Sequence, residues 1–470
     1  MMKESFNSAR NWLASVISTD QNNPYLDAFL KQIGGSYTKY DTNNKTYLEQ
    51  GFGKNPDVYA VIKQMSDKTS SIPWSVKRVK DEQAKTRLDR FRHTTKYNHT
   101  PQQYIKSKGL KAAAFEEKEL EFPMERPNIM QTWADIKALY ETFLSATGNV
   151  FFYMSSPENG INAGEPTNLY VLPSHMMQII VKDNIDMQGV ENPISHYLLI
   201  EGNSFVRFEA ENVIHVKLAN PFYDSQGSHL YGLSPLRAAL RNIQSSNEAI
   251  DNNNRTLLNS GAFGFLHSKG QNVMTDTQAK ALKQRLVEMD KDGSRLGQIA
   301  ATNAEIGFTR IALTTDELKP FDYLKFDQKM ICNVLGWETK LLNDDDGAKY
   351  DNYKLASKVA LGKSIIPHNR LLEEAFNQHF LPRFKGYEGA VLEFEYEDLP
   401  EMQPDMKLLV EWMLPVMREG VLNRDEVREG INFPMLDTPE MTTHTVSMST
   451  IPLEEAILGS SFEGELNIDE

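Results

Sequence analysis

The feature that most constrains this chain is a long polar helix that begins at the motif Tyr231-Gly232-Leu233-Ser234-Pro235-Leu236. Ser234 is a typical helix N-cap, because its hydroxyl oxygen can accept from an unpaired backbone N–H, and Pro235 suits the first helical position. A narrow apolar stripe follows at helical spacing, formed by Leu236, Leu240, Ile243, Ile250 and Leu257. The pattern therefore predicts a helix over about residues 234–260.

The other faces of this helix are rich in uncharged amides, carried by Asn242, Asn247, Asn252, Asn253, Asn254 and Asn259. Asparagine is a mediocre helix former, so the sequence accepts a loss of helix propensity for these polar faces. Such a helix suits a bundle in which identical neighbours pack side by side around water. The alternative is an ordinary amphipathic surface helix, which is more often rich in Glu and Lys.

Length and composition indicate a folded protein of two to four domain-sized units, with 470 residues, 40% apolar and 24% charged. No run approaches the ~18 consecutive apolar residues that a membrane span needs. The N-terminus lacks an apolar secretory core, so export is not expected. Cys332 is the one cysteine, which excludes an internal disulfide framework and a multi-cysteine zinc site and suits a reducing cytoplasm.

Charge is unevenly distributed along the chain, whose net charge is −14. Residues 1–118 carry 20 Lys and Arg against 12 Asp and Glu, whereas residues 387–470 carry 4 against 20. This asymmetry predicts attraction between basic and acidic surfaces of one molecule or of neighbouring copies. A nucleic-acid-binding patch between Lys77 and Lys111 is a second interpretation, but the acidic total argues against tight binding of a duplex.

The first half of the chain predicts an α+β domain with a mostly antiparallel sheet. The pattern predicts an arm over residues 1–50 and a helix over residues 55–74 that ends near Pro73. Residues 77–118 are expected to form a strand followed by a long exposed loop. Thr132-Trp133 opens another helix. Alternating apolar residues then predict strands at 150–153, 169–172, 177–180, 196–200 and 213–216.

After the polar helix, the pattern predicts a compact insert on a hairpin-like stalk. Strands are expected at 263–266 and 304–308, and capping boxes at 275–278 and 314–317 open two helices. Residues 341–351 break regularity, and a long helix follows at 353–380 with a kink at Pro367. A strand at 392–396, two short helices within 404–434 and an acidic tail beyond residue 442 complete the chain.

Catalytic motifs fail when they are tested residue by residue. Gly362-Lys363-Ser364 resembles the end of a phosphate-binding loop, but the required earlier glycine is Ser357 and the triplet lies in a helical pattern. Gly232-Leu233-Ser234 lacks the second glycine of a nucleophile elbow, because position 236 is Leu. His175 and His215 lie in strand patterns and are interpreted as sheet residues. The methionines at 402, 406, 413 and 417 are interpreted as helix packing.

Asp344-Asp345-Asp346 is the one candidate for a divalent metal, but the run does not fit a calcium-binding loop. Counting from Gly347 places Leu342 and Tyr353 where that loop needs ligands. A solvated, self-repelling turn is the preferred interpretation of these carboxylates. No metal or cofactor is therefore expected.

The order of the motifs resembles that of the portal proteins of tailed bacteriophages, in the HK97-like branch. The resemblance covers about residues 55–434. It is carried by Asn55-Pro56-Asp57-Val58-Tyr59, Ser71-Ile72-Pro73, Arg126-Pro127-Asn128, Thr147-Gly148-Asn149, Leu172-Pro173, Asn212-Val213-Ile214-His215-Val216-Lys217, Tyr231-Gly232-Leu233-Ser234-Pro235-Leu236, Leu335-Gly336-Trp337 and Asp346-Gly347-Ala348-Lys349-Tyr350.

The resemblance implies a multi-domain α+β portal fold and a ring of twelve subunits at one capsid vertex, through which the genome is packaged and ejected. By analogy, the parts are an arm (1–50), a wing (51–233), a stem helix (234–262), a clip (263–313), a stem or tunnel helix (314–340), a tunnel loop (341–355), a wing helix and strand (356–403), and a crown with an acidic tail (404–470).

The resemblance also implies site residues and partners. The tunnel loop facing DNA would comprise Asn343, Asp344, Asp345, Asp346, Gly347, Ala348, Lys349 and Tyr350. The stem lining would comprise Asn242, Asn247, Asn253 and Asn254, and partner docking on the clip would use Lys280, Lys283, Arg285, Asp290 and Lys291. The implied partners are double-stranded DNA, a terminase (the packaging ATPase), a head–tail adaptor, the major capsid protein and a scaffold, with no membrane.

The implied location is the virion, with the host cytoplasm during assembly. Such a protein would not be an enzyme. Two alternatives stay open: a metal-dependent DNA-processing enzyme of phage origin that uses the three aspartates, and another ring-shaped capsid adaptor.

Overall fold

In the computed structural model the chain forms two compact units. The first unit is Met1–Ala238 with Cys332–Glu470, and the second unit is Ala239–Ile331. The structure describes residues 36–37, 43–95, 100–157, 159, 163–182, 192–202, 204–222, 228–258, 264–268, 277, 280, 306–310, 320–342, 350–397, 399–403, 406–431, 433–436 and 438–444.

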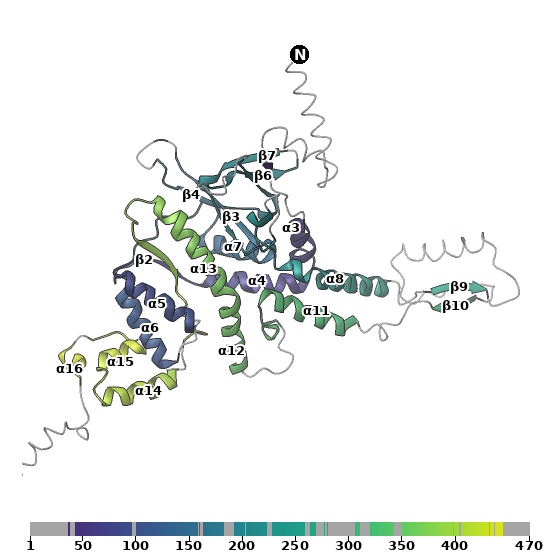
Figure 1. Cartoon of the computed structure of the whole chain (residues 1–470). Coiled ribbons are helices and arrows are strands. Elements are labelled where there is room, and N and C mark those ends of the chain that lie inside the picture. The colour runs from purple at the N-terminus through teal and green to yellow at the C-terminus, as the bar shows by residue number, and fades with distance from the viewer. Residues whose placement is uncertain are drawn as a thin grey trace, which may run out of the picture. The chain divides into compact units, whose positions relative to one another are not determined.

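Two packed helices, α4 (Pro56–Ser71) and α7 (Trp133–Thr147), form the helical part of the first unit's core (Figure 1). Asn55 caps α4, because its side chain accepts from two backbone N–H groups at 3.1 Å. A capping box at Thr132 opens α7. Both helices were predicted from the sequence and are confirmed, including the end of α4 just before Pro73.

Two antiparallel sheets follow. One has the order β4-β3-β8, with β4 Asn168–Leu172, β3 Asn149–Ser155 and β8 Val213–Lys217. The other has the order β1-β5-β6-β7, with β1 Ser36–Tyr37, β5 Met177–Val181, β6 Ile194–Glu201 and β7 Ser204–Glu209. One cluster of buried side chains includes residues of both sheets and comprises Phe151, Leu172, Met177, Ile179, Tyr197, Val213 and Tyr231. The five predicted strands are confirmed, but they belong to two sheets, and β7 was not predicted.

The prediction for residues 77–118 was half right. The strand is β2 (Trp74–Arg78), but the expected exposed loop is two helices, α5 (Glu82–Thr95) and α6 (Pro101–Ala114), which lie against each other (Figure 1). A capping box at Thr100 opens α6. The segment has few apolar residues, but they are placed where the two helices meet and form a small buried cluster of Ala84, Leu88, Ala114 and Phe115.

The β2 strand pairs antiparallel with β11 (Ala390–Phe394), so segments about 320 residues apart form one two-stranded ribbon. A long helical segment precedes β11. It consists of α12 (Tyr350–Ala360), a π-helical turn (Leu361–Ile365), α13 (Ile366–Ala375), a second π-helical turn (Phe376–Phe380) and a 3₁₀ turn (Leu381–Arg383). The disturbance predicted at Pro367 is thus a π-helical turn directly before it, within a continuous helical segment.

The C-terminal helices are α14 (Met406–Arg418), α15 (Arg424–Gly430) and the short α16 (Pro439–Thr442). Two short helices within 404–434 are therefore confirmed. Leu409, Met413 and Val427 form their buried cluster. The predicted packing role of the methionine stripe holds for residues 402, 413 and 417, whereas Met406 is exposed.

Shorter elements connect these parts: α3 Asn43–Thr46, a π-helical turn at Tyr47–Phe52, and 3₁₀ turns at Ser174–Met176, Ala210–Asn212, Ser228–Leu230 and Thr339–Leu341. His175 lies in one of these turns and not in a strand, which corrects its predicted position. None of the helices in the described part of the chain combines the length and the apolarity that a bilayer crossing requires.

The second unit contains most of α8 (Leu236–Leu258) and α11 (Pro320–Leu335) together with the hairpin of β9 (Gly264–Ser268) and β10 (Ile306–Arg310) (Figure 1). The polar helix and both strands of the insert are confirmed. The helix predicted after residue 275 and the capping box at 314–317 lie outside the described residues, apart from residues 277 and 280.

Candidate functional site

Two of the motifs found in the sequence meet where α8 begins. The Asn149 amide bridges to Gly232: its Nδ2 donates to the Gly232 carbonyl at 3.0 Å, and its Oδ1 accepts from the Gly232 N–H at 2.6 Å. Gly148 has φ +73°, and a Cβ on Gly232 would lie 2.0 Å from the Gly148 carbonyl oxygen. The two backbones therefore approach closely enough to require glycine.

Ser234 has a different role from the predicted helix cap. Its side chain is buried, and its hydroxyl donates to the Ala146 carbonyl at 2.7 Å. The serine thus ties the start of α8 to the end of α7. The helix start is located by this bond and by the Asn149 bridge.

Within the second unit, the amide face of α8 is partly used against α11. Asn242 Nδ2 donates to Asp327 Oδ1 at 2.8 Å, and Asp327 is buried. Asn247 is also buried, Asn253 is half-buried and Asn254 is exposed. Of the four predicted lining residues, Asn254 therefore offers the most accessible side chain, and the lining role of the set stays a prediction.

Most of the predicted tunnel loop and clip surface falls outside the described residues. Asn343 through Lys349 are not described, and Tyr350 is the first residue of α12. On the clip, Lys280 is exposed, while Lys283, Arg285, Asp290 and Lys291 are not described. The roles assigned to these residues stay predictions.

The chain on the N-terminal side of the loop is held firmly within the first unit. Trp337 Nε1 donates to Gln64 Oε1 at 2.9 Å, and Gln64 Nε2 donates to the Leu341 carbonyl at 3.2 Å. Ser364 is buried and donates to the carbonyls of Leu335 and Gly336, both at 2.9 Å. The Leu335-Gly336-Trp337 motif thus fixes the point from which the loop departs.

Ser364 also settles the Gly362-Lys363-Ser364 motif. The triplet forms part of a π-helical turn, and the serine hydroxyl is bound to backbone carbonyls. Backbone amides inside a helix are not available to a phosphate. The rejection of a nucleotide-binding loop is confirmed.

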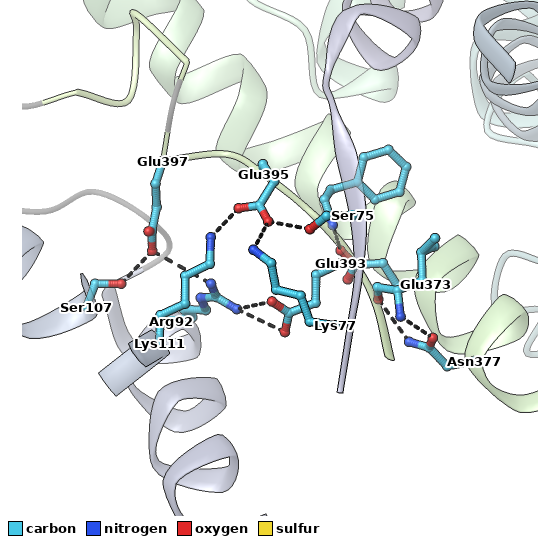
Figure 2. Close-up of polar contacts among 12 residues, drawn as sticks. Ser75, Lys77, Arg92, Ser107, Lys111, Glu373, Asn377, Glu393, Glu395 and Glu397 are labelled. Carbon is cyan, nitrogen blue, oxygen red and sulfur yellow. Dashed lines mark hydrogen bonds and ion pairs between the residues drawn. The ribbon is translucent and has the colours of Figure 1, made fainter. Parts of the chain in front are cut away.

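An ion-pair network joins the basic and acidic parts of the chain in the first unit (Figure 2). Its acidic residues alternate along and after β11, so Glu393 and Glu395 lie on the face opposite Leu392 and Phe394. Its basic residues come from β2, α5 and α6. The contacts are Lys77 Nζ to Glu395 Oε1 at 2.6 Å, Arg92 Nη1 to Glu393 Oε1 at 3.2 Å, Arg92 Nη2 to Glu397 Oε1 at 3.7 Å and a short pair between Lys111 and Glu395.

Hydroxyl groups complete the network. Ser75 donates to Glu395 and Ser107 to Glu397, both at 2.6 Å. Burial alone would raise the pKa of the Glu395 carboxyl, but Lys111, Lys77 and Ser75 outweigh burial and lower this pKa to about 2. The predicted attraction within one molecule is confirmed. Because three basic side chains of the segment are committed to glutamates, the nucleic-acid interpretation of this segment loses support.

The histidines in the sheets have structural roles. His215 stacks on Phe151 with ring centroids 4.2 Å apart, and its Nε2 lies 3.1 Å from Asn149 Oδ1. Burial, reinforced by Lys217, lowers the pKa of His215 to about 3, so this ring is neutral. Among the described residues, no group of three or more His, Cys, Asp or Glu side chains is placed to hold a metal. Asp344 to Asp346 lie outside the described residues.

Comparison with known proteins gives one family and one fold. The sequence model described as "Phage portal protein" matches residues 56–432. A search of curated proteins finds no match. The neck of an empty gene transfer agent (GTA) particle, computed with C6 symmetry, contains a similar chain with a TM-score of 0.55 and 19% identity, covering 87% of this chain and 98% of that one.

A chain from the native GTA neck, computed with C12 symmetry, has a TM-score of 0.53 and 18% identity, and it covers 87% of this chain and 98% of that one. An HK97-family phage portal protein from Corynebacterium diphtheriae has a TM-score of 0.46 and 11% identity, covering 77% of this chain and 99% of that one. At these identities, the two GTA likenesses establish the fold.

Proposed function

This chain belongs to the phage portal protein family, and we propose that about twelve copies of it form a closed ring at one vertex of a capsid. Double-stranded DNA would be packaged and ejected through the centre of this ring, and the ring would connect head and tail. The family match over residues 56–432 is the observation that carries the proposal. Support comes from the similar chains in GTA necks, one of them computed with C12 symmetry.

The chemistry of the described residues suits a path along which DNA slides. A channel that bound phosphates tightly would hold DNA in place, because each Lys or Arg contact with a phosphate releases counterions and strengthens binding. On the amide-rich α8, Asn254 is exposed and offers a polar but uncharged group, and the exposed Arg237 and Arg241 stand with the exposed Glu248 on the same helix. We propose Asn343 to Tyr350 as the loop that faces DNA, where Lys349 among four nearby aspartates makes weak, salt-screened contacts.

We propose a structural and not a catalytic role. The clip (263–313) would dock the terminase during packaging and a head–tail adaptor later, with Lys280 as its one described exposed candidate. The major capsid protein and a scaffold would contact the remaining outer surfaces. The protein would reside in the virion and, during assembly, in the host cytoplasm.

Two alternatives are separated from this proposal by measurement. A metal-dependent DNA-processing enzyme using Asp344, Asp345 and Asp346 would degrade DNA when magnesium is added to the purified protein. A portal protein would show no turnover at any metal concentration. A capsid adaptor without a central DNA path would form rings but would not alter DNA retention when the loop is changed.

Shortening the loop over residues 343–352 tests the DNA-facing role. We expect rings to assemble normally, because the segment before the loop is held by Trp337 and Ser364, while DNA packaging or retention falls. The measurements are electron microscopy of the rings and the DNA content of the particles. Loss of ring assembly in the shortened variant would count against the tunnel-loop role.

A further inference from the structure

A pocket of about 520 Å³ opens beside β2 in the first unit. Its lining is partly aromatic: Trp74 stacks on Phe122 with ring centroids 5.3 Å apart, and Trp133 meets Phe122 edge-on at 4.6 Å. Trp133 Nε1 donates to the Met124 carbonyl at 3.1 Å, which fixes the indole ring. The pocket is therefore preformed, since its rings support one another.

The rim of this pocket is acidic. Glu119, Glu121 and Glu125 line it. Glu119 is paired with Lys77 at 3.1 Å. Glu121 and Glu125 are exposed and have no ion-pair partner within the part of the chain that the structure describes. Lys137 Nζ already lies 5.1 Å from the centroid of the Trp74 ring. The groups that the rim offers to a further cationic side chain are therefore the exposed carboxylates of Glu121 and Glu125.

An apolar tip stands in the loop that borders the pocket, between Glu125 and Trp133. Ile129 is 91% exposed and Met130 is 85% exposed, the highest values among the exposed large apolar residues described. The buried Asn128 holds this loop: its Oδ1 accepts from the Met130 N–H at 2.9 Å and its Nδ2 donates to the Leu169 carbonyl at 2.8 Å. Ile129 and Met130 are thus held in place as a pair of exposed apolar side chains beside the pocket.

A basic face lies on α5 of the same unit. Arg92 of this helix is buried in the ion-pair network, whereas Arg87 and Arg90 are exposed. They are three residues apart and so lie on one side of the helix, together with the uncharged Gln83 and Thr94. Neither arginine has an ion-pair partner within the described ranges.

We propose that the basic face of α5 (Arg87 and Arg90) on one copy binds the acidic aromatic pocket of the next copy in the ring. The inference rests on the ring proposed above. A closed ring needs two different, complementary surfaces on each subunit, and these two surfaces match in charge. Guanidinium groups pair with carboxylates, and the aliphatic stems of arginine side chains cover apolar side chains such as Ile129 and Met130.

Charge exchange tests the inference on the full-length protein. Glu121→Lys with Glu125→Lys, and separately Arg87→Glu with Arg90→Glu, are expected to lower the fraction of protein in rings about tenfold at low salt, because like charges then face each other. The combination of all four changes is expected to restore rings. Glu201→Lys with Glu211→Lys is the matched control, since it makes the same charge change at two exposed glutamates elsewhere.

Ring fractions are measured by analytical ultracentrifugation and electron microscopy, and far-UV circular dichroism checks that each variant is folded. If both charge-reversed double variants form rings in the same fraction as the wild type, the inference is overturned and the proposed function stands. Ring loss that the four-residue combination does not restore would overturn it too. A wild-type protein that forms no rings would overturn both the inference and the ring on which it rests.

Discussion

Glu395 is the residue through which the two charged parts of the chain meet, because it contacts Ser75, Lys77 and Lys111 together. Its side chain is 11% exposed, so water screens these contacts little. A carboxylate in such a place is stabilised only while its partners remain. The acidic part of the sequence thus has a folding role in addition to any surface role.

We predict that the protein loses stability in acid as the Glu395 carboxylate becomes protonated. The pKa of this carboxyl falls from the ordinary 4.5 to about 2 on folding. Its contribution, roughly 3 kcal/mol by linkage, is therefore present above pH 4.5 and is lost as the pH falls toward 2. Glu395→Gln should lower the free energy of unfolding by about this amount at pH 7 and should flatten the acid dependence.

Urea unfolding from pH 7 down to pH 2 measures this effect. Glu440→Gln, at an exposed position outside the network, serves as the control and should follow the wild type. An unchanged acid dependence in Glu395→Gln would show that the network does not carry the predicted stability.

The junction where β3 and α8 begin shows how elements distant in sequence are joined. Gly232 has no room for a Cβ, since such an atom would lie 2.0 Å from the Gly148 carbonyl oxygen. A Cβ added to Gly362, in the π-helical turn, would have no neighbouring atom within 4 Å. The two glycines therefore make a matched pair for substitution by alanine.

We predict that Gly232→Ala destabilises the protein by about 3 kcal/mol or more, because the backbones must separate and the Asn149 bridge is lost. Gly362→Ala should be neutral or slightly stabilising, since alanine is the better helix former. Thermal unfolding of both variants measures the difference. Equal melting temperatures would refute the close approach at this junction.

Apolar residues at helical or strand spacing predicted most of the helices and strands. The helices α4, α7 and α8 each have an apolar stripe, and the first two also have a visible cap, so local sequence was sufficient. β7 was missed although Gly202-Asn203 separates two runs of alternating residues, which is a two-residue hairpin signal. All of its residues except Phe208 are largely exposed, so its apolar pattern was weak.

The helices α5 and α6 were missed for a different reason. Their apolar residues are few, and the segment is rich in Lys and Arg, which is typical of a solvated loop. Their basic side chains pair with glutamates on and just after β11, about 300 residues away. The glutamates alternating with Leu392 and Phe394 were visible in the sequence, but that pattern predicts a solvent-facing side of a strand. Pairing across such a separation is not a local property.

The sequence predicted which elements form the candidate site but not the side-chain contacts between them. The sequence indicated the polar helix and argued against a phosphate-binding loop at Gly362-Lys363-Ser364. It did not indicate that Asn242 would bind Asp327 or that Ser234 would bind the end of α7. These contacts depend on which faces the helices turn to each other. Periodicity in one sequence does not fix those faces.

For the whole molecule, the charge asymmetry has two parts. One part is satisfied within the chain, by the ion-pair network between β2, α5 and α6 and the glutamates of β11. The other part remains on the surface, where Arg87 and Arg90 of α5 are exposed. A protein of this family that acts as a ring would use the remaining surface charges between copies.

Electron microscopy of the purified full-length protein, with class averages viewed along the symmetry axis, tests whether the protein is a ring. We predict a closed ring of about twelve subunits with a central hole wide enough for a DNA duplex. A preparation that contains only monomers and dimers at every concentration, with and without a scaffold, would contradict it.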